Sequence, residues 1–174
     1  MNDSALSNPS IIFEPLHEDT QCPHRATEGS AGYDLFAYVR GSRVTCSDGA
    51  RSWEIESEQR DGSAYLELPP AVTALVPLGF KARLPAGFEA QVRPRSGTTF
   101  RKGLLIPNAP GTVDADFPDE WKVLVRNAVA HPVRIEHGER IAQMVLHRFE
   151  VLPFEHGRVE LTSSRRGGFG STGH

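Results

Sequence analysis

The 174-residue chain has only two cysteines, no long apolar run and no excess of positive charge. Cys22 and Cys46 form no Cys-x-x-Cys pair and no disulfide framework, which indicates a reducing, cytoplasmic compartment. No apolar run approaches the length of a membrane span. The residues after Met1 lack the basic and apolar regions of a signal peptide. We therefore expect a protein without a membrane partner.

The charge balance argues against a nucleic-acid partner as well. The formal net charge is −3 at pH 7, whereas binding to duplex nucleic acid needs Lys and Arg to neutralise phosphates. The balance still leaves room for a local basic pocket that binds a small phosphate ligand. Long helices are also disfavoured, because 13 prolines are spread along the chain and proline breaks a helix interior.

Short strand-like runs, separated by turns that contain Pro or Gly, recur through the chain. Such runs at regular spacing are typical of an all-β sandwich or barrel, and the length suits a single domain. One helical turn is predicted at 96–102, ended by Gly103. The expected strands are 11–13, 33–37, 65–68, 71–76, 80–84, 88–92, 104–106, 121–126, 133–135 and 140–149.

Composition divides the chain into three parts. Residues 1–10 are small and polar, and we expect them to be disordered. Residues 11–163 form the β domain, and residues 164–174 form a mobile, Gly-rich C-terminal arm. Within the domain, residues 39–63 are polar and poor in aliphatic side chains, which predicts a surface insertion with a hairpin around 53–55. The insertion is either a tolerated loop or a partner-binding arm, and we favour the loop because such insertions cost little free energy.

The segment 111–127 is where we expect the chemistry. Asp114 and Asp116 follow the turn at Pro110 and Gly111, and a strand-like run begins at Trp121. Residues two apart in an extended chain point to the same side, so the two acids share one face unless the turn rotates them apart. Taken alone, this composition is also that of an ordinary solvated hairpin end.

Four further motifs place this segment in a larger pattern. In chain order the five motifs are Ala31-Gly-Tyr-Asp-Leu35, Pro94-Arg-Ser-Gly97, Gly111-Thr-Val-Asp-Ala-Asp-Phe117, Glu139-Arg-Ile-Ala-Gln143 and Gly167-Gly-Phe-Gly-Ser-Thr-Gly173. Each motif alone is compatible with a turn, a surface strand or a flexible end. In this order and spacing they resemble the five motifs of the trimeric deoxyuridine triphosphatase (dUTPase) family. The resemblance runs from about Ile11 to the C-terminus, leaving out 39–63.

The resemblance implies an all-β, jelly-roll-like (β-clip) subunit and a homotrimer with active sites at the subunit interfaces. The implied reaction is hydrolysis of dUTP to dUMP and pyrophosphate, which lowers dUTP and supplies dUMP. The implied cofactor is Mg²⁺, which commonly keeps several waters and binds substrate phosphates, so we expect no direct protein ligand for it. The C-terminal arm would close over the site of a neighbouring subunit.

The resemblance also assigns catalytic roles. Asp114 is the expected general base that activates the attacking water, a role that a well-placed carboxylate can fill. Asp34 would support the metal–water network, and Gln143 would contact a phosphate or hold the water. The expected phosphate-binding donors lie on one turn, where charge-assisted and backbone donors suit an anion: Arg95, Ser96 and Gly97.

Selection of the nucleoside is assigned to the hairpin and the arm. Asn108 carries both a donor and an acceptor, which suits recognition of uracil. Phe117 would pack on the deoxyribose and exclude a 2′-hydroxyl, and Phe169 would stack on the base. The remaining expected substrate contacts are Thr112, Val113, Lys122, Arg165, Arg166, Gly170, Ser171 and Thr172.

Three positions depart from the family pattern. Phe117 stands where Tyr is usual, so a hydroxyl is missing. Pro118 and Asp119 replace the more common pair of a basic residue and Gly. The arginine that the family has five residues before the arm phenylalanine is Ser164 here. Either of the next two residues, both arginines, would have to reach the phosphates by a changed backbone path.

Two alternative functions share the scaffold or the motifs. Deoxycytidine triphosphate deaminase and the bifunctional deaminase-diphosphatase use a Glu where this chain has Leu124. The signature of a zinc deaminase is absent as well. A dUTPase-like regulatory binding protein without turnover is disfavoured because the expected catalytic and binding residues are retained: Asp34, Arg95, Ser96, Asp114, Gln143 and Phe169.

Overall fold

The computed structural model describes residues 9–160. The predicted disorder of most of the N-terminal ten residues and the predicted arm at 164–174 lie outside the described residues. In chain order the strands are β1 (Ile12–Pro15), β2 (His24–Arg25), β3 (Tyr33–Phe36), β4 (Arg43–Ser47), β5 (Ser52–Glu56), β6 (Glu58–Arg60), β7 (Ser63–Leu68), β8 (Thr73–Pro77), β9 (Phe80–Arg83), β10 (Phe88–Pro94), β11 (Leu104–Leu105), β12 (Gly111–Val113), β13 (Lys122–Asn127), β14 (Val133–Glu136) and β15 (Arg140–Arg148); helix α1 spans Ser96–Lys102.

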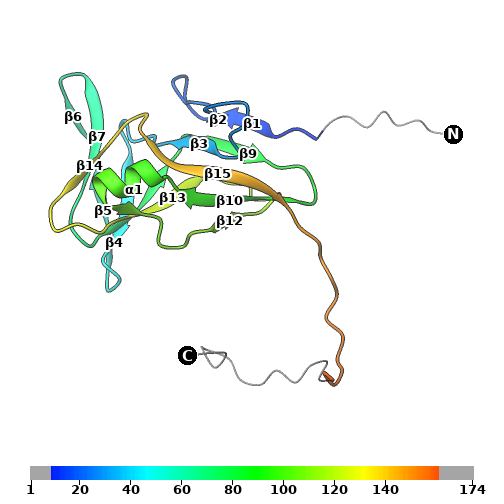
Figure 1. Cartoon of the computed structure of the whole chain (residues 1–174). Coiled ribbons are helices and arrows are strands. Elements are labelled where there is room, and N and C mark those ends of the chain that lie inside the picture. The colour runs from blue at the N-terminus through cyan, green and yellow to red at the C-terminus, as the bar shows by residue number, and fades with distance from the viewer. Residues whose placement is uncertain (1–8, 161–174) are drawn as a thin grey trace.

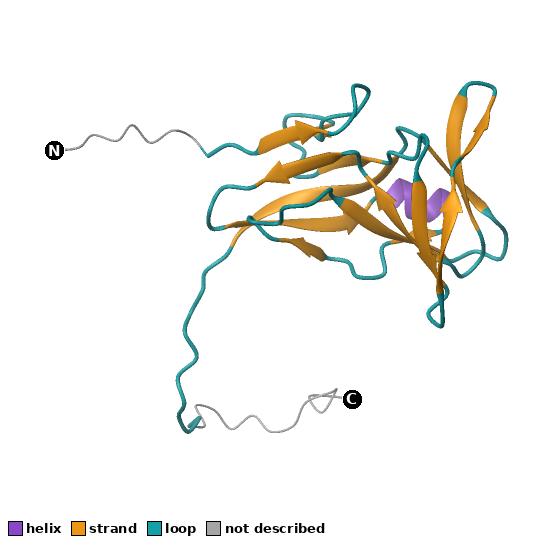
Figure 2. Ribbon diagram, turned by 180° about the vertical axis from the view of Figure 1, so that it is seen from behind, coloured by secondary structure: helices purple, strands orange, loops and turns teal. Residues whose placement is uncertain are grey.

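Two antiparallel five-stranded sheets make up the body of the molecule (Figures 1 and 2). One, the β10 sheet, has the order β12-β10-β15-β3-β2, and the other, the β13 sheet, has the order β11-β13-β8-β4-β5. β1 pairs with β9, and β14-β7-β6 form a three-stranded sheet that projects from the body at the upper left of Figure 1. The all-β prediction is confirmed.

A single hydrophobic cluster joins the two large sheets. Leu35 and Ala90 belong to the β10 sheet, Val76 and Val125 belong to the β13 sheet, and all four are fully or almost fully buried in the same cluster. Buried and more exposed residues alternate along β13, which is the period of two expected of a strand with one face in the core. Burial of this apolar surface provides a rigid support for side chains on the outer faces.

The segment 39–63 is not a purely surface excursion. Its predicted hairpin is confirmed, since β4 pairs with β5 and Cys46 lies opposite Trp53. However, β4 also pairs with β8, and Val44 and Cys46 are buried in the core. The sequence signal was weak because only two inward-facing residues of a five-residue strand are apolar. Burial raises the pKa of the Cys46 thiol to about 11, and both Cys46 and Cys22 are free.

Helix α1 has the predicted bounds and follows directly on β10 through Arg95. Gly103 ends it in the left-handed conformation, with φ of 63°, and donates its N–H to Thr99 O at 2.9 Å. Thr98 is buried, and its hydroxyl donates to the carbonyl oxygen of Arg140 at 3.2 Å. The helix is therefore fixed to the start of β15, which holds the turn before it in place.

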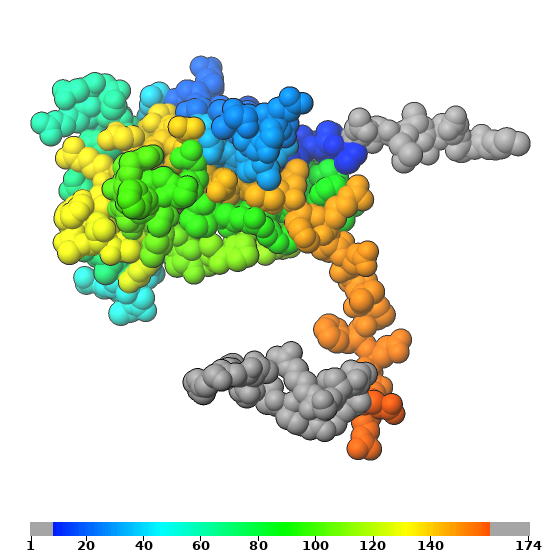
Figure 3. Space-filling model, viewed as in Figure 1, coloured from blue at the N-terminus to red at the C-terminus, as the bar shows by residue number. Residues whose placement is uncertain are grey.

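The chain leaves the body after β15. Residues 149–160 have no assigned strand or helix and are exposed throughout, and Figures 1 and 3 show them running away from the sheets. The segment exposes several apolar side chains: Phe149, Val151, Leu152, Phe154 and Val159. Because apolar surface of this kind is normally covered, the segment is a candidate contact with another molecule.

Candidate active site

The outer face of the β10 sheet carries a row of polar side chains across three neighbouring strands. The register places Arg93 on β10 opposite Gln143 on β15, and Gln143 opposite Asp34 on β3. Residues directly opposite in a sheet point to the same face, so these side chains stand side by side. The strand order thus brings together motifs that are far apart in the sequence.

A β-bulge adds a fourth side chain to this row. The register of β15 against β3 shifts between Arg140 and Ala142. In a regular strand, Arg140 and Gln143 would face opposite sides because they are three residues apart. The extra residue of the bulge moves Arg140 to the side of Gln143, where its Nη1 donates to Asp34 Oδ2 at 3.2 Å.

Asp34 is the centre of the hydrogen bonds in this row. It is only 7% exposed, and its Oδ1 accepts from Arg95 Nε at 2.7 Å. Arg95 Nη1 also donates to the carbonyl oxygen of Arg140 at 3.3 Å. Two guanidinium groups therefore satisfy the buried carboxylate, and their bonds fix the orientation of Arg95.

The side chain of Gln143 is also fixed in orientation, but by a backbone carbonyl group. Its Nε2 donates to Pro94 O at 2.9 Å. A Cβ at Gly32 would overlap the Oε1 atom of Gln143, so the glycine of the first motif makes room for this side chain. The sequence motif Ala31-Gly32 thus has a packing reason that sequence reasoning did not find.

Arg93, Asp34, Arg95 and Gln143 line an open cleft of about 450 Å³, here called the arginine cleft. Five predicted residues meet in it: Asp34, Arg95, Ser96, Gly97 and Gln143. Sequence reasoning missed Arg93, which also lines the cleft. A signal was present, because Arg93 lies two residues before Arg95 and therefore points to the same side of the strand.

A second cleft of about 230 Å³, here called the aspartate cleft, lies beside β12 and the start of β13. Its lining includes five predicted residues, namely Thr112, Val113, Asp114, Phe117 and Lys122, together with Leu75, Glu120 and Trp121. The two clefts share no lining residue. The predicted residues of one chain therefore fall into two separate groups.

The turn after β12 separates the two acids of the third motif. Phe117 N donates to Asp114 O at 3.3 Å, which closes a turn. Asp114 lines the aspartate cleft, whereas Asp116 lines a different cleft with Ile12 and Lys81. The turn thus rotates the acids apart. Phe117, which follows them, lines both clefts. Of the two acids, only Asp114 lines the cleft with Thr112, Val113 and Lys122.

The structure does not bring every predicted residue into a cleft. Asn108 lines neither cleft. Its side chain lies over Gly111, where a Cβ would be 2.8 Å from its Nδ2 atom. The predicted arm contacts lie outside the described residues: Arg165, Arg166, Phe169, Gly170, Ser171 and Thr172.

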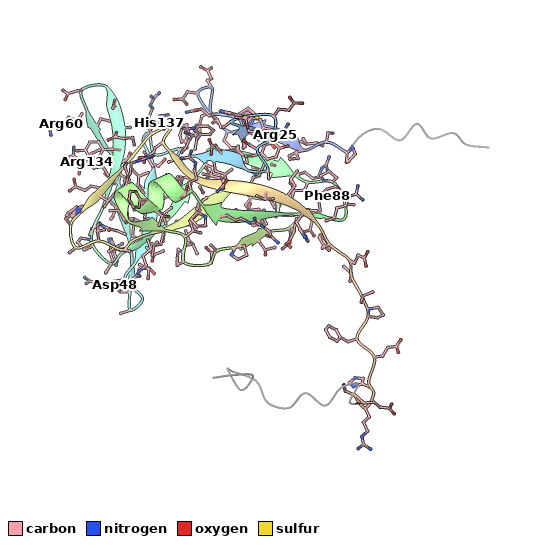
Figure 4. All side chains as sticks on the ribbon, viewed as in Figure 1. Arg25, Asp48, Arg60, Phe88, Arg134 and His137 are labelled. Atoms are coloured by element: carbon pink, nitrogen blue, oxygen red, sulfur yellow. The ribbon has the colours of Figure 1, made fainter. Side chains whose placement is uncertain are left out.

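Another cleft, of about 610 Å³, lies by the three-stranded sheet, where Figure 4 labels Arg60, Arg134 and His137. None of the predicted site residues lines it.

Within residues 9–160 no group of three His, Cys, Asp or Glu side chains is arranged to hold a metal ion. No helix in the same range is long and apolar enough to cross a membrane.

An all-β fold whose clefts combine exposed arginines with an accessible carboxylate suits the class of protein that binds an anionic ligand and carries out acid–base chemistry. The comparisons with known proteins narrow this class. The dUTPase family profile matches residues 62–173. The chain is also 42% identical, over 90% of its length and 87% of the relative's, to the deoxyuridine 5'-triphosphate nucleotidohydrolase of Rhizobium etli (strain CIAT 652). The protein belongs to the dUTPase family.

Solved structures agree with this assignment at the level of fold. The dUTPase of Staphylococcus bacteriophage 80alpha, in complex with dUPNHPP, is 21% identical, with a TM-score of 0.73 over 96% of this chain and 99% of the other. A variant of the dUTPase from phage phi11 of S. aureus, described with a structural Mg(II) ion, is 17% identical, with a TM-score of 0.67 over 88% and 99%. The family fold predicted from the motifs is therefore confirmed.

Proposed function

We propose that the protein hydrolyses dUTP to dUMP and pyrophosphate. The observation that carries the proposal is the grouping of the motif residues into an arginine cleft and an aspartate cleft on one family fold. A nucleoside triphosphate needs both groups, because its phosphates require cationic donors and its cleavage requires an activated water. The curated relative from Rhizobium etli bears the corresponding enzyme name.

The arginine cleft suits the triphosphate. Arg95 presents a fork of donors that Asp34 holds in one orientation, and pre-organised donors lose little freedom when an anion binds. Ser96 and Gly97 add backbone donors at the same turn. Gln143 lies close enough in the same cleft to bind a phosphate oxygen or the attacking water.

The aspartate cleft suits the nucleoside and the water. Asp114 is exposed at the turn after β12 and lines the cleft, so its carboxylate can accept a proton from a bound water. Phe117 is 41% exposed and lines the same cleft. An accessible ring in this position can pack against the deoxyribose.

The donor set fits Mg²⁺ that is bound mainly through the substrate. Asp34 is the one carboxylate in the lining of the arginine cleft, and both of its oxygens already accept from arginines. A protein cage is therefore not offered there, while Mg²⁺ readily binds phosphate oxygens and keeps several waters. When bound, it would neutralise charge on the phosphates, and Asp34 would orient its waters.

We further propose that the working form is a homotrimer. The two clefts of one chain share no lining residue, which supports a complete site that is formed where the arginine cleft of one subunit meets the aspartate cleft of another. The exposed apolar segment 149–160 supports contact between copies. The arm at 164–174 would follow this segment onto a neighbouring subunit and bring Phe169 to the base. A cytoplasmic location stays a prediction.

Deamination of dCTP is not favoured. The deaminases of this scaffold would need a Glu where Leu124 stands on β13, opposite Leu75 of β8. A pair of aliphatic side chains at this position provides no acid–base group.

Comparing four nucleotides tests the proposed function directly. With Mg²⁺, the protein is expected to release pyrophosphate from dUTP much faster than from dCTP, dTTP or UTP. Pyrophosphate release from the four substrates, measured in parallel with ammonia release from dCTP, checks this. Ammonia from dCTP, or equal turnover of dTTP, would contradict the proposal.

Phe117→Ala is expected to relax discrimination between dUTP and UTP. Removal of the ring opens space at C2′ and removes a stacking surface, so the ratio of kcat/KM for the two nucleotides should fall about tenfold. Phe100→Ala is the matched control, because Phe100 is 90% exposed on α1 and lines neither cleft. An unchanged ratio in the Phe117 variant would reject the role of the ring in sugar selection.

A further inference from the structure

Arg93 stands in the arginine cleft but is not part of any of the five motifs. It is exposed on β10, directly opposite Gln143, and lines the cleft together with Arg95. It stands at one end of the row, next to Gln143. Whether its charge can act on a ligand depends on how many of its donors are already bound.

The hydrogen bonds of the two cleft arginines differ. Arg95 uses Nε and Nη1 on Asp34 and on the backbone, and Arg140 shares the same carboxylate. Arg93 donates Nη2 to Gln91 Oε1 at 2.6 Å, and among residues 9–160 it has no ion pair. Arg93 therefore keeps most of its donors and its full charge for a ligand.

A short ladder of side chains along β10 orients Arg93. Gln91 Nε2 donates to Glu89 Oε1 at 2.8 Å while Gln91 Oε1 accepts from Arg93. The carboxylate thus fixes the orientation of the amide, and the amide carbonyl holds one edge of the guanidinium. Because Gln91 is neutral, this support costs Arg93 none of its charge.

The arm motif gives a chemical reason for such a residue. Ser164 stands where the pattern would have an arginine, and the two arginines that follow it are shifted along the chain, so a further cation in the cleft itself would add to the charge that binds the triphosphate. A guanidinium binds phosphate oxygens bidentately, which a neutral side chain cannot replace.

We propose that Arg93 is a further substrate-binding residue, which contacts the triphosphate of dUTP beside Gln143 and adds to the positive charge of Arg95, which Asp34 partly neutralises. The proposal rests on the proposed function, since it places the phosphates in the arginine cleft. It assigns to Arg93 ground-state binding of the phosphates and no proton transfer.

Arg93→Gln tests the proposal by the split between KM and kcat. Loss of a charge-assisted contact made in both the ground state and the transition state raises KM and leaves kcat nearly constant. We expect KM for dUTP to rise at least about tenfold, kcat to change less than about threefold, and Arg93→Lys to recover part of the loss. Binding of dUpNHpp should weaken by a factor similar to the change in KM.

Two variants serve as references for this measurement. Arg43→Gln makes the same change of charge on β4, where Arg43 is 69% exposed and pairs with Glu56, and it should leave KM within about twofold. Arg95→Gln tests the site itself. If Arg95→Gln weakens binding of dUpNHpp while Arg93→Gln does not, only the role of Arg93 is refuted. If neither variant weakens binding, the placement of the phosphates fails as well.

A structural role for Arg93 would give a different result. In that case Arg93→Gln would lower the melting temperature or break up the oligomer, and Arg93→Lys would be as impaired as Arg93→Gln. Thermal melting and light scattering of both variants reveal this outcome, which would overturn the proposal.

Discussion

Asp114→Asn is expected to lower kcat for dUTP by about 10²–10⁴-fold while the affinity for dUTP is mostly retained, because the change removes a general base but keeps its shape. Among residues 9–160 the carboxylate of Asp114 takes part in no hydrogen bond or ion pair, and the residue is exposed at the turn after β12. The substitution therefore removes no stabilising contact, and the melting temperature should stay the same.

Asp116→Asn is the matched control for this prediction. It lies two residues further along the same turn and carries the same charge, but it lines a different cleft. We expect its kcat to stay within about twofold of the unmodified protein. Single-turnover hydrolysis and binding of dUpNHpp separate chemistry from affinity. Near-normal kcat in Asp114→Asn would show that another group activates the water.

The fold was largely predictable because its signal is repeated along the chain. Short runs with a period of two, bounded by Pro and Gly, correspond to most of the strands, and Ser96 to Gly103 set both ends of the helix. The burial of β4 in the core was missed because polar residues flank its two inward-facing residues. Its place in a sheet depends on pairing with β8, a contact that lies far away in the sequence.

The motif residues of the candidate site could be named from the sequence, but their arrangement could not. The motifs named Asp34, Arg95 and Gln143, yet only the register of three strands shows that they form one row. Arg140 enters that row through a bulge, which no periodic pattern reveals. The division of the predicted residues between two clefts likewise depends on long-range pairing, as does the turn that separates Asp114 from Asp116.

Asp34→Ala is the second large expected effect, and it acts through two arginines. Without the carboxylate, Arg95 loses its fixed orientation and Arg140 loses its partner. Breaking a buried pair by removing one partner typically costs 3–5 kcal/mol. Here the arginines are 23% and 50% exposed, so water replaces part of the lost interaction, and we expect about 1–3 kcal/mol of stability to be lost.

The loss of activity should exceed what the loss of stability explains. We expect kcat/KM for dUTP to fall at least about 100-fold at a temperature where Asp34→Ala is still folded, because a misplaced phosphate donor weakens positioning of the substrate. Asp19→Ala is the control, since Asp19 also accepts from an arginine, Arg40, but lies outside both clefts. It should lower the melting temperature with little change in kcat/KM.

Co-assembly of two inactive variants then tests whether each active site is built from two neighbouring subunits. Asp34→Ala impairs the arginine cleft and leaves the aspartate cleft intact, whereas Asp114→Asn does the reverse. In mixed trimers, the arginine cleft of an Asp114→Asn subunit can meet the aspartate cleft of an Asp34→Ala subunit and form an unmodified site. Coexpressed subunits should therefore regain turnover that neither variant has alone, measured as pyrophosphate release per trimer. If the mixture stays as inactive as its parts, each site is built within one subunit, and the division of the site between neighbours is wrong.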